Sequence, residues 1–487
     1  MSQHDIYRAV YHFTPSVNFI NDPNGLVFFR GEYHLFYQYN PFGDRSAHKC
    51  WGHAVSSDLA RWEHLPVALW EDEAGQIFSG SAVVDWANTS GFGGPDAPAL
   101  VAIYTAHTPT EETQHIAFST DAGRAWTKYA GNPVIAIGSR NFRDPKVLWH
   151  EPTRRWIMVT VLADLHRVRF YGSPDLRHWT HLNDFGPAGS ADGVWECPDL
   201  FPLAVEGAEG EARWVLKVDV GSHNLPTNEG AQYFVGRFDG VCFTNDNPPE
   251  LALWADAGRD FYAVQSWSDI PAADGRRLWL AWLSNWHYAN ITPTAPWRGM
   301  MTIPRVVTLR RTPVGLRLAQ RPVAELEALR RTHFGRAGLP VSEANRQLQA
   351  AGLAGDALEI IADFRLDTAT EIGLRVRVGS AEATVIGYDV AAQHLCVDRS
   401  QSGNVGFSSG FPGRRTAALP QAEGRVRLHV FVDRCSVEVF GGAGEAVLTD
   451  LIFPSPDSQG LEVYSAAGEA GADALLERLD IWRLEQT

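Results

Sequence analysis

The sequence lacks the features that define several large classes of protein. No apolar run reaches the length needed to cross a membrane, and the first residues contain no apolar segment typical of a secretion signal. Lysine and arginine form no long cluster, and the net charge of −15 disfavours a nucleic acid as partner. We therefore expect a protein that binds neither membranes nor nucleic acids.

Cysteine is also scarce. The five cysteines are odd in number, far apart in the chain and without a CxxC pair: Cys50, Cys197, Cys242, Cys396 and Cys435. Such spacing predicts neither a disulfide framework nor a metal site, and it fits a reducing compartment. The expected location is cytoplasmic, unless a secretion signal has been removed from the chain.

Motifs of the common metal and cofactor enzymes are missing as well. The chain has no HExxH, no glycine-rich phosphate loop, no G-x-S-x-G and no metal-spaced cluster of cysteine and histidine. This disfavours zinc proteases, nucleotide-binding enzymes and α/β-hydrolases. We expect neither a cofactor nor a metal ion at the functional site.

Helical periodicity is nearly absent, and short strands dominate. Alternating or apolar runs broken by Gly, Pro, Asn and Asp predict strands at 25–29, 33–39, 100–104, 156–161, 214–220 and 278–282. Further strands are predicted at 358–364, 371–378, 426–432 and 436–440. The one clear helical pattern, at 322–331, lies between these two regions. The predicted fold class is all-β.

A repeated turn divides the first region into units. Asp58, Asp121 and Asp175 each begin a tight turn that is followed by tryptophan, and Asp239 begins a weaker copy. A period of about 60 residues fits one four-stranded blade, so about 310 residues predict a five-bladed β-propeller, with unrelated turns as the alternative. The predicted domains are the propeller at 1–318, a helical linker at 319–340 and a C-terminal β-sandwich at 341–487.

Three acidic residues stand beside or near prolines in the propeller region. Asp22 lies in NDPNG at 21–25, which reads as a glycine-terminated turn, Asp144 in FRDP at 142–145, and Glu196 in WECPD at 195–199. Each segment alone also fits a structural turn, a local ion pair or a strand end. Because propeller strands converge on an axial pocket, we expect the three carboxyl groups to meet there.

Two such carboxyl groups suffice for cleavage of a glycosidic bond. One must be ionised to attack or stabilise the sugar, and the other must hold a proton for the leaving oxygen. Glu196, between Trp195 and Cys197, has the more apolar neighbours in the sequence, whereas Asp22 and Asp144 stand beside polar donors. Seventeen tryptophans and thirteen tyrosines suit a protein core and also the apolar faces of sugars.

These segments and others in the same order make the sequence resemble the β-fructofuranosidases of glycoside hydrolase family 32, the group of invertases, exo-inulinases and levanases. The resemblance runs nearly end to end, through residues 21–25, 36–41, 51–54, 78–82, 142–145, 195–199, 260–263, 284–290 and 433–440. It implies a five-bladed propeller followed by a β-sandwich. It also implies a retaining, exo-acting β-fructosidase that releases terminal fructose from sucrose, fructo-oligosaccharides, inulin or levan without a cofactor.

The resemblance also assigns roles to individual residues. Asp22 would be the nucleophile that forms a fructosyl-enzyme, Glu196 the acid and then the base, and Asp144 a stabiliser of the transition state. A retaining reaction implies that the Asp22 and Glu196 carboxyl groups lie about 5–5.5 Å apart. The fructose subsite would be lined by Asn21, Gln38, Trp51, Phe78, Ser81, Arg143, Tyr262 and Trp286.

Two other functions remain open on the sequence. A fructosyltransferase passes the same fructosyl-enzyme to a sugar, so only the acceptor side of the pocket distinguishes it. Residues 220–229 depart from the glycine-rich loop expected before 232–236, which leaves acceptor preference open. A non-catalytic fructan-binding protein is the second alternative, and it would need no proton-donating acid. Monomer and homodimer are both compatible with the sequence.

Overall fold

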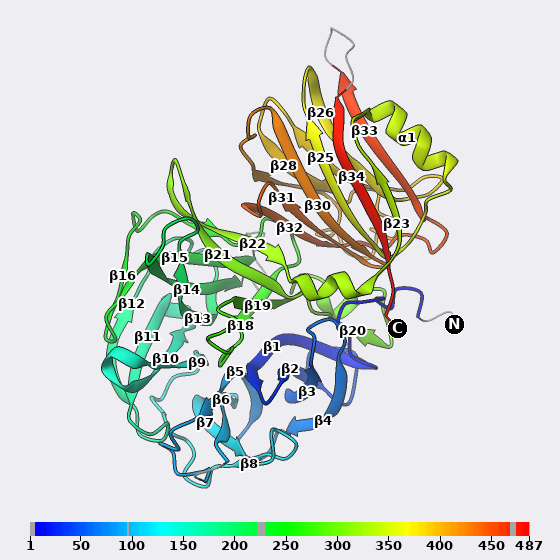
Figure 1. Cartoon of the computed structure of the whole chain (residues 1–487). Coiled ribbons are helices and arrows are strands. Elements are labelled where there is room, and N and C mark those ends of the chain that lie inside the picture. Colours follow the sequence, from blue (N-terminus) through cyan, green and yellow to red (C-terminus); the bar gives the residue numbers. More distant parts are fainter. Residues whose placement is uncertain (1–4, 95–96, 222–228, 468–473, 487) are drawn as a thin grey trace.

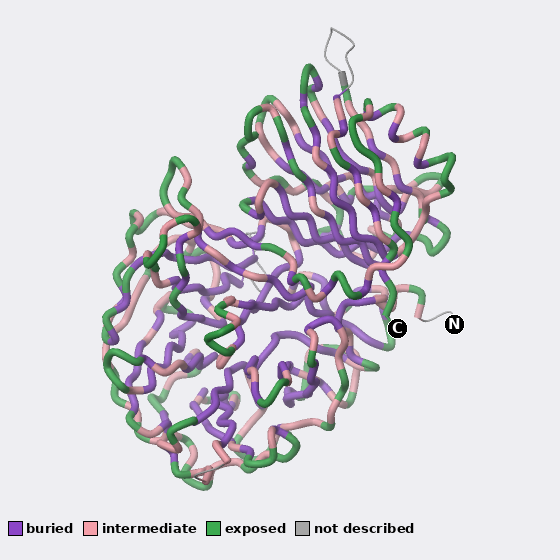
Figure 2. Tube along the Cα trace, in the orientation of Figure 1, coloured by how far each residue is buried: buried purple, intermediate pink, exposed green. Residues whose placement is uncertain are grey.

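Strands make up most of the computed structural model, which describes residues 5–94, 97–221, 229–467 and 474–486. The first part of the chain forms a ring of sheets, and the last part forms two packed sheets that lie against the ring (Figure 1). Buried residues fill the interior of both parts (Figure 2). Within the described ranges, no helix has the length and apolar character needed to span a membrane.

The ring consists of five antiparallel sheets, each built from four strands that mostly follow one another in the chain. The first three blades contain β1 (Asn18–Phe29), β2 (Glu32–Asn40), β3 (Cys50–Ser56) and β4 (Glu63–Leu69); β5 (Gln76–Asp85), β6 (Ala99–His107), β7 (Glu112–Ser119) and β8 (Thr127–Lys128); and β9 (Phe142–His150), β10 (Arg155–Leu162), β11 (Arg167–Ser173) and β12 (Thr180–Phe185). The last two contain β13 (Val194–Ala204), β14 (Ala212–Gly221), β15 (Gly230–Phe238) and β16 (Phe243–Asn245); and β18 (Tyr262–Ser266), β19 (Arg277–Trp282), β21 (Arg305–Thr312) and β22 (Gly315–Pro322). Two short strands are added: β17 (Leu253–Trp254) on β15, and β20 (Trp297–Arg298) parallel to β1.

The first strand of each blade lines the axis of the ring. β1 lies beside β5, β5 beside β9, β9 beside β13, β13 beside β18, and β18 again beside β1. This closed order confirms the predicted five-bladed propeller. Hydrophobic clusters fill the space between successive blades, as where Ile157 of the third blade meets Val218 and Phe234 of the fourth.

The repeated aspartates form the turns that the sequence predicts. Asp58 Oδ1 accepts hydrogen bonds from the backbone N–H groups two and three residues further on, and Asp175 and Asp239 make the same pair of bonds. Asp121 Oδ1 accepts a bond from a backbone N–H four residues on. Each turn joins the last two strands of its blade. The fifth blade turns at Thr312 instead, which explains why the repeat has only four copies.

All five axial strands are irregular near their first residues. The pairing of each with its neighbour shifts register there, in β1 between Ile20 and Pro23 and in β13 between Glu196 and Asp199. Gly25, with φ of +54°, adopts a left-handed conformation in β1. The segment predicted as a glycine-terminated turn at 21–25 is therefore a bulged part of a strand. Bulges of this kind redirect side chains, here toward the axis.

The last part of the chain forms the predicted β-sandwich around its own hydrophobic core. One sheet contains β23 (Arg330–Arg336), β24 (Leu339–Pro340), β25 (Leu358–Arg365), β30 (Arg425–Asp433), β31 (Ser436–Gly441), β32 (Ala446–Leu451) and β34 (Leu475–Leu484). The other contains β26 (Ala369–Val378), β27 (Thr384–Asp389), β28 (His394–Asp398), β29 (Arg414–Ala418) and β33 (Gly460–Ala467). The α-helix α1 (Val341–Ala350), which the sequence did not predict, packs against β33.

The helical pattern predicted at 322–331 forms a short 3-10 helix, η4 (Ala324–Leu329). Its buried residues recur at every third position from 323 to 329, which matches the three residues per turn of a 3-10 helix. β22 belongs to the fifth blade and β23 to the sandwich, so we infer that the connection between them is shorter than the predicted 319–340. The remaining 3-10 helices are η1 (Glu151–Thr153), η2 (Ala163–Leu165) and η3 (Ala289–Ile291).

Buried charges join the propeller to the sandwich. The two ring nitrogens of His12 each lie 2.8 Å from a carboxylate oxygen, one of Asp433 and one of Glu438. Arg305 of β21 donates hydrogen bonds to Glu438 and to Asp256. All five side chains are fully buried. One continuous polar network therefore fixes the two domains against each other.

Candidate active site

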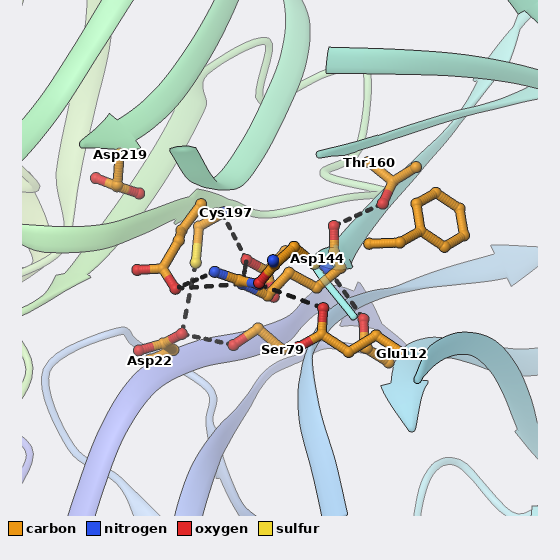
Figure 3. Close-up of polar contacts among 12 residues, drawn as sticks. Asp22, Ser79, Glu112, Asp144, Thr160, Cys197 and Asp219 are labelled. Carbon is orange, nitrogen blue, oxygen red and sulfur yellow. Dashed lines mark hydrogen bonds and ion pairs between the residues drawn. The ribbon is translucent and has the colours of Figure 1, made fainter. Parts of the chain in front are cut away.

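Three carboxyl groups from three different blades meet at one end of the propeller axis. Asp22 comes from β1, Asp144 from β9 and Glu196 from β13, and Cys197 lies between the first two (Figure 3). The backbone N–H of Cys197 donates to Asp144 Oδ2 at 2.8 Å, and its thiol donates to Asp22 Oδ2 at 3.4 Å. The bulge that gives Cys197 a φ of +47° makes both contacts possible. The expected meeting of the three acids is thus present in the structure.

The carboxylate of Asp22 is held by a small ring of hydrogen bonds. Asn21 Nδ2 donates to Asp22 Oδ1 at 2.8 Å, and Ser79 Oγ donates to Asp22 Oδ2 at 2.6 Å. Gln38 links these two donors, since it accepts from Asn21 and donates to Ser79, each at 2.7 Å. Asp22 is 8% exposed and has a single supported orientation, as a nucleophile requires.

A buried lysine supports this ring from behind. Lys49 Nζ donates to Asn21 Oδ1, so the amide nitrogen of Asn21 faces Asp22. The ammonium group also lies 4.9 Å from the ring centre of Phe19 and 5.6 Å from that of Trp286. Burial lowers the pKa of Lys49 to about 7, although the negative charge of Asp22 opposes this shift.

Arg143 connects the other acidic groups. Its guanidinium lies 3.2 Å from Glu196 Oε1, 3.3 Å from Glu112 Oε2 and 4.0 Å from Asp144 Oδ2. Burial works against its charge, but the three carboxylates outweigh that effect and raise the pKa of Arg143. One cation is therefore shared among three acids.

Glu196 has polar partners rather than the apolar ones its sequence neighbours suggested. Tyr262 Oη donates to Glu196 Oε2 at 2.5 Å, and Arg143 Nε donates to Oε1 at 3.3 Å. The side chain of Trp195 instead turns into the core between two blades and donates to the backbone oxygen of Ser190. Alternation along the strand turns Trp195 away from the carboxyl group, so the apolar environment expected for Glu196 is wrong.

Two further carboxyl groups are crowded by negative charge. Burial, reinforced by Glu196 and Asp22, raises the pKa of Asp144 to about 8, although Arg143 opposes the shift. Burial also raises the pKa of Asp219 to about 7, although the neighbouring Lys217 opposes it. Perturbations of this size are typical of functional sites. Asp144 does not have the ionising environment that its sequence neighbour Arg143 suggested.

The other predicted subsite residues divide into buried supports and exposed rings. Trp51 is fully buried and donates to the backbone oxygen of Phe78, and Ser81 Oγ donates to the backbone oxygen of Pro145. These two side chains therefore hold the strands in place. Phe78 and Trp286 are partly exposed, which leaves ring surface for a ligand.

Sequence reasoning missed several residues of the site. Lys49, Ser79, Glu112 and Asp219 all contact or influence the catalytic candidates, yet none was predicted. Ser79 lies inside a segment that carried the resemblance, at 78–82. Asp219 was visible as a charged residue inside the apolar run at 214–220.

Carboxyl groups brought together at one end of a propeller axis, with hydrogen-bond donors and aromatic rings beside them, are the arrangement of a glycoside hydrolase. The chain belongs to the glycosyl hydrolases family 32. Residues 12–322 match the model of its N-terminal domain, and residues 325–483 match that of its C-terminal domain.

Individual relatives agree with this assignment. The chain is 52% identical over 467 residues to a levanase of Bacillus subtilis, which covers 95% of this chain and 68% of that protein. It is 39% identical to an extracellular exo-inulinase of Aspergillus ficuum, covering 95% and 92%. The crystal structure of an exo-inulinase from Aspergillus awamori superposes with a TM-score of 0.89 at 35% identity, covering 98% of both chains. A fructofuranosidase of Schwanniomyces occidentalis solved with fructose gives a TM-score of 0.89 at 30% identity, covering 100% and 99%.

Proposed function

We propose that the protein is an exo-acting β-fructosidase that hydrolyses terminal, non-reducing β-D-fructofuranosyl residues of levan, inulin, fructo-oligosaccharides and sucrose. The observation that carries this proposal is the meeting of Asp22, Asp144 and Glu196 at the propeller axis, linked through Cys197 and Arg143. Relatives named levanase and exo-inulinase, matched over most of the chain, support the choice of fructans as substrates.

The proposed reaction proceeds by double displacement. Asp22 attacks the anomeric carbon and forms a fructosyl-enzyme, while Glu196 gives its proton to the departing oxygen. Glu196 then takes a proton from water, which attacks the same carbon and releases fructose with its configuration retained. The bonds from Ser79 and Asn21 hold Asp22 for the first step, and Tyr262 holds Glu196 for both.

Asp144 has a different role in this proposal. The backbone N–H of Asp144 donates to Thr105 Oγ1, and its Oδ2 accepts the N–H of Cys197. The other carboxyl oxygen, Oδ1, can therefore bind fructose hydroxyls. Such bonds strengthen as positive charge develops on the sugar ring. Asp144 would therefore stabilise the transition state without forming a bond to carbon.

Attack at chain ends is supported by the relatives named exo-inulinase, and the axis beneath the acids is closed. Lys217 Nζ donates to the backbone oxygen of Cys197 at 2.7 Å, and the N–H of Ser266 donates to Asp199 Oδ2 at 2.7 Å. These buried groups fill the axis immediately below the carboxylates. A polysaccharide therefore cannot thread through the propeller along its axis.

Hydrolysis, rather than transfer to an acceptor sugar, is part of the proposal. The sequence raised fructosyl transfer as an alternative on the basis of residues 220–229, but residues 222–228 of that segment lie outside the described residues. The relatives are named levanase and exo-inulinase, and both names favour water as the acceptor.

The product profile tests the proposal. Wild-type protein and Asp22→Asn are incubated with sucrose, inulin and levan, and the products are separated by chromatography. Free fructose as the first and main product, from wild type alone, is expected. Added methanol should trap the intermediate as methyl β-fructofuranoside, which reports retention. Internal fragments, longer oligosaccharides or full activity of Asp22→Asn would contradict the proposal.

We also propose, as the free cysteines suggested, a reducing compartment for this chain. All five thiols are unpaired, and four of them are buried. The relatives from Aspergillus are named extracellular, so this proposal needs its own test. Fractionation of cells that express the natural gene would decide it.

A further inference from the structure

A second cavity lies at the other end of the propeller axis. Its volume is about 630 Å³, within the range of sites that bind small molecules. The later residues of β5, β9, β13 and β18 surround it, whereas the catalytic candidates lie near the first residues of these strands. Four tryptophans, the buried Lys146 and the partly exposed Arg277 contribute to its lining; the tryptophans are Trp86, Trp149, Trp156 and Trp214.

The indole rings in this cavity are held in fixed orientations. Trp86 Nε1 donates to Asp269 Oδ1 at 2.8 Å, and Trp149 Nε1 donates to Glu151 Oε2 at 2.6 Å. Trp86 is nevertheless 63% exposed, so its ring surface faces solvent. A large exposed indole with its N–H already bonded offers an apolar face to a ligand at little cost in conformational entropy.

The floor of the cavity carries polar groups with bonding capacity to spare. Ser266 Oγ is fully buried and has no hydrogen-bond partner among the described residues, which is a costly arrangement unless a water completes it. Lys146 and Arg277 lie beside it, and each donates to one backbone oxygen. The partly exposed Arg277 therefore offers a donor to acceptors on a ligand, and Asp269 offers a carboxylate to ligand hydroxyls.

This cavity is separate from the active site. Lys146 lies 3.4 Å from Asp199 Oδ2, and Asp199 also accepts the N–H of Ser266. Above that layer, Lys217 bonds to the backbone of Cys197. A sugar bound among the tryptophans therefore cannot reach Asp22.

We propose that this cavity is a second, non-catalytic carbohydrate site that binds a stretch of neutral fructan chain. The exposed indole of Trp86 and the partly exposed rings of Trp149 and Trp214, beside hydrogen-bonding side chains, match the alternation of apolar ring faces and hydroxyl groups in a saccharide. The net charge of −15 disfavours an anionic ligand. The identity of the saccharide rests on the proposed function, since a fructan is long enough to contact both ends of the axis.

The second site would act through local concentration. A polymer held at the tryptophans keeps its ends close to the catalytic pocket, so apparent affinity for long chains rises without any new contact near Asp22. Sucrose is too short to bind both sites at once, so its apparent affinity would not rise.

The test compares Trp86→Ala and Trp86→Ala/Trp149→Ala with Val314→Ser, an exposed apolar residue outside the cavity. Retention of each protein in native gels that contain levan or inulin is measured in an Asp22→Asn background, which leaves the polymer intact. The cavity variants should lose most of the retention, and the control should not. With Asp22 restored, their KM for levan should rise about fivefold or more while kcat/KM for sucrose stays unchanged.

The outcomes separate the two proposals. Retention and polymer KM equal to wild type in both cavity variants would overturn the second site. An equal fall in sucrose and levan turnover would also overturn it, because that result indicates damage to the fold. Absence of any fructan hydrolysis by wild type would refute the proposed function, yet the gel assay would still report polysaccharide binding.

Discussion

The active site and the interdomain interface both bury charged side chains, but they arrange them in opposite ways. At the interface, His12 and Arg305 stand between acidic groups, and each carboxylate contacts a cation. Although burial works against ionisation, these partners lower the pKa of Asp433 and of Glu438. The charges there are paired, and their effect is structural.

The active site instead holds more carboxylates than its cations can satisfy. Arg143 is shared among three acids, and burial and negative neighbours raise the pKa of Asp144 to about 8. Crowding of like charges costs stability, and it also provides groups that exchange protons near neutral pH. Burial alone therefore does not mark an acid as functional. A buried acid becomes a functional candidate when it has too few cationic partners to balance its charge.

The largest difference is expected between Asp22→Asn and Asp433→Asn. Asp22→Asn removes the proposed nucleophile and keeps the shape of the side chain, so kcat should fall by about 10⁴-fold or more with stability maintained. Asp433→Asn leaves His12 with one acidic partner and should cost about 3 kcal/mol of unfolding free energy while kcat stays near wild type. Steady-state kinetics and urea unfolding measure both quantities. If both substitutions lowered kcat equally, the assignment of a catalytic role to one region and a structural role to the other would be wrong.

A second prediction concerns the cation at the interface. Arg305→Met removes a fully buried guanidinium and leaves Asp256 and Glu438 without it, so the unfolding free energy should fall by about 3–5 kcal/mol. The matched control is Arg311→Met, which breaks an exposed ion pair and should change stability by less than about 1 kcal/mol. A stable Arg305→Met protein would mean that the network does not hold the domains together.

The sequence predicted those parts of the molecule that depend on local chemistry. The aspartate turns are formed by residues two to four positions apart, so their repeat identified four blades before any contact was known. The strands of both domains were visible for the same reason. The exception is the helical pattern at 322–331, where apolar residues three positions apart fit a 3-10 helix as well as an α-helix.

Contacts between distant strands were not predictable in this way. Lys49 reaches Asn21 across 28 positions and Ser79 reaches Asp22 across 57, and no local pattern in the sequence shows that these residues pair. The environment of Glu196 was misjudged because its large apolar neighbour Trp195 faces away from it. The proline-flanked segments supplied the three acids and the resemblance supplied their roles, whereas their shared arginine and crowded charges required the fold.

Histidine at the interface should produce a stability that falls as pH rises. Burial disfavours a charged ring, but hydrogen bonds to Asp433 and Glu438 raise the pKa of His12 to about 9, above its ordinary value of 6.5. Between these two values the folded chain holds a proton that the unfolded chain has lost, so this contribution is complete below pH 6.5 and disappears through pH 9.

Urea unfolding of wild type and His12→Gln at pH 6, 7.5 and 9 measures this contribution. The gap between the two proteins should be largest at pH 6 and should shrink with each step. His333→Gln is the control, because that ring is about half exposed and pairs with Asp480 at the surface. A gap that is constant with pH would show that His12 does not carry the charge.

Lys49→Met should give the smallest effect and the opposite slope. Burial lowers the pKa of Lys49 to about 7 against the attraction of Asp22, so between pH 7 and its ordinary value of 10.5 the unfolded chain holds the extra proton. Wild-type stability therefore gains from rising pH through this group, and the variant should lose that gain while being at least as stable at pH 6. Its kcat should fall about tenfold, because Asn21 loses the donor that orients it toward Asp22. Urea unfolding at pH 6, 7.5 and 9 and kcat measured over the same pH range report both effects. A variant whose stability changed with pH as steeply as that of wild type would mean that Lys49 stays charged in the folded protein, like the paired cations at the interface.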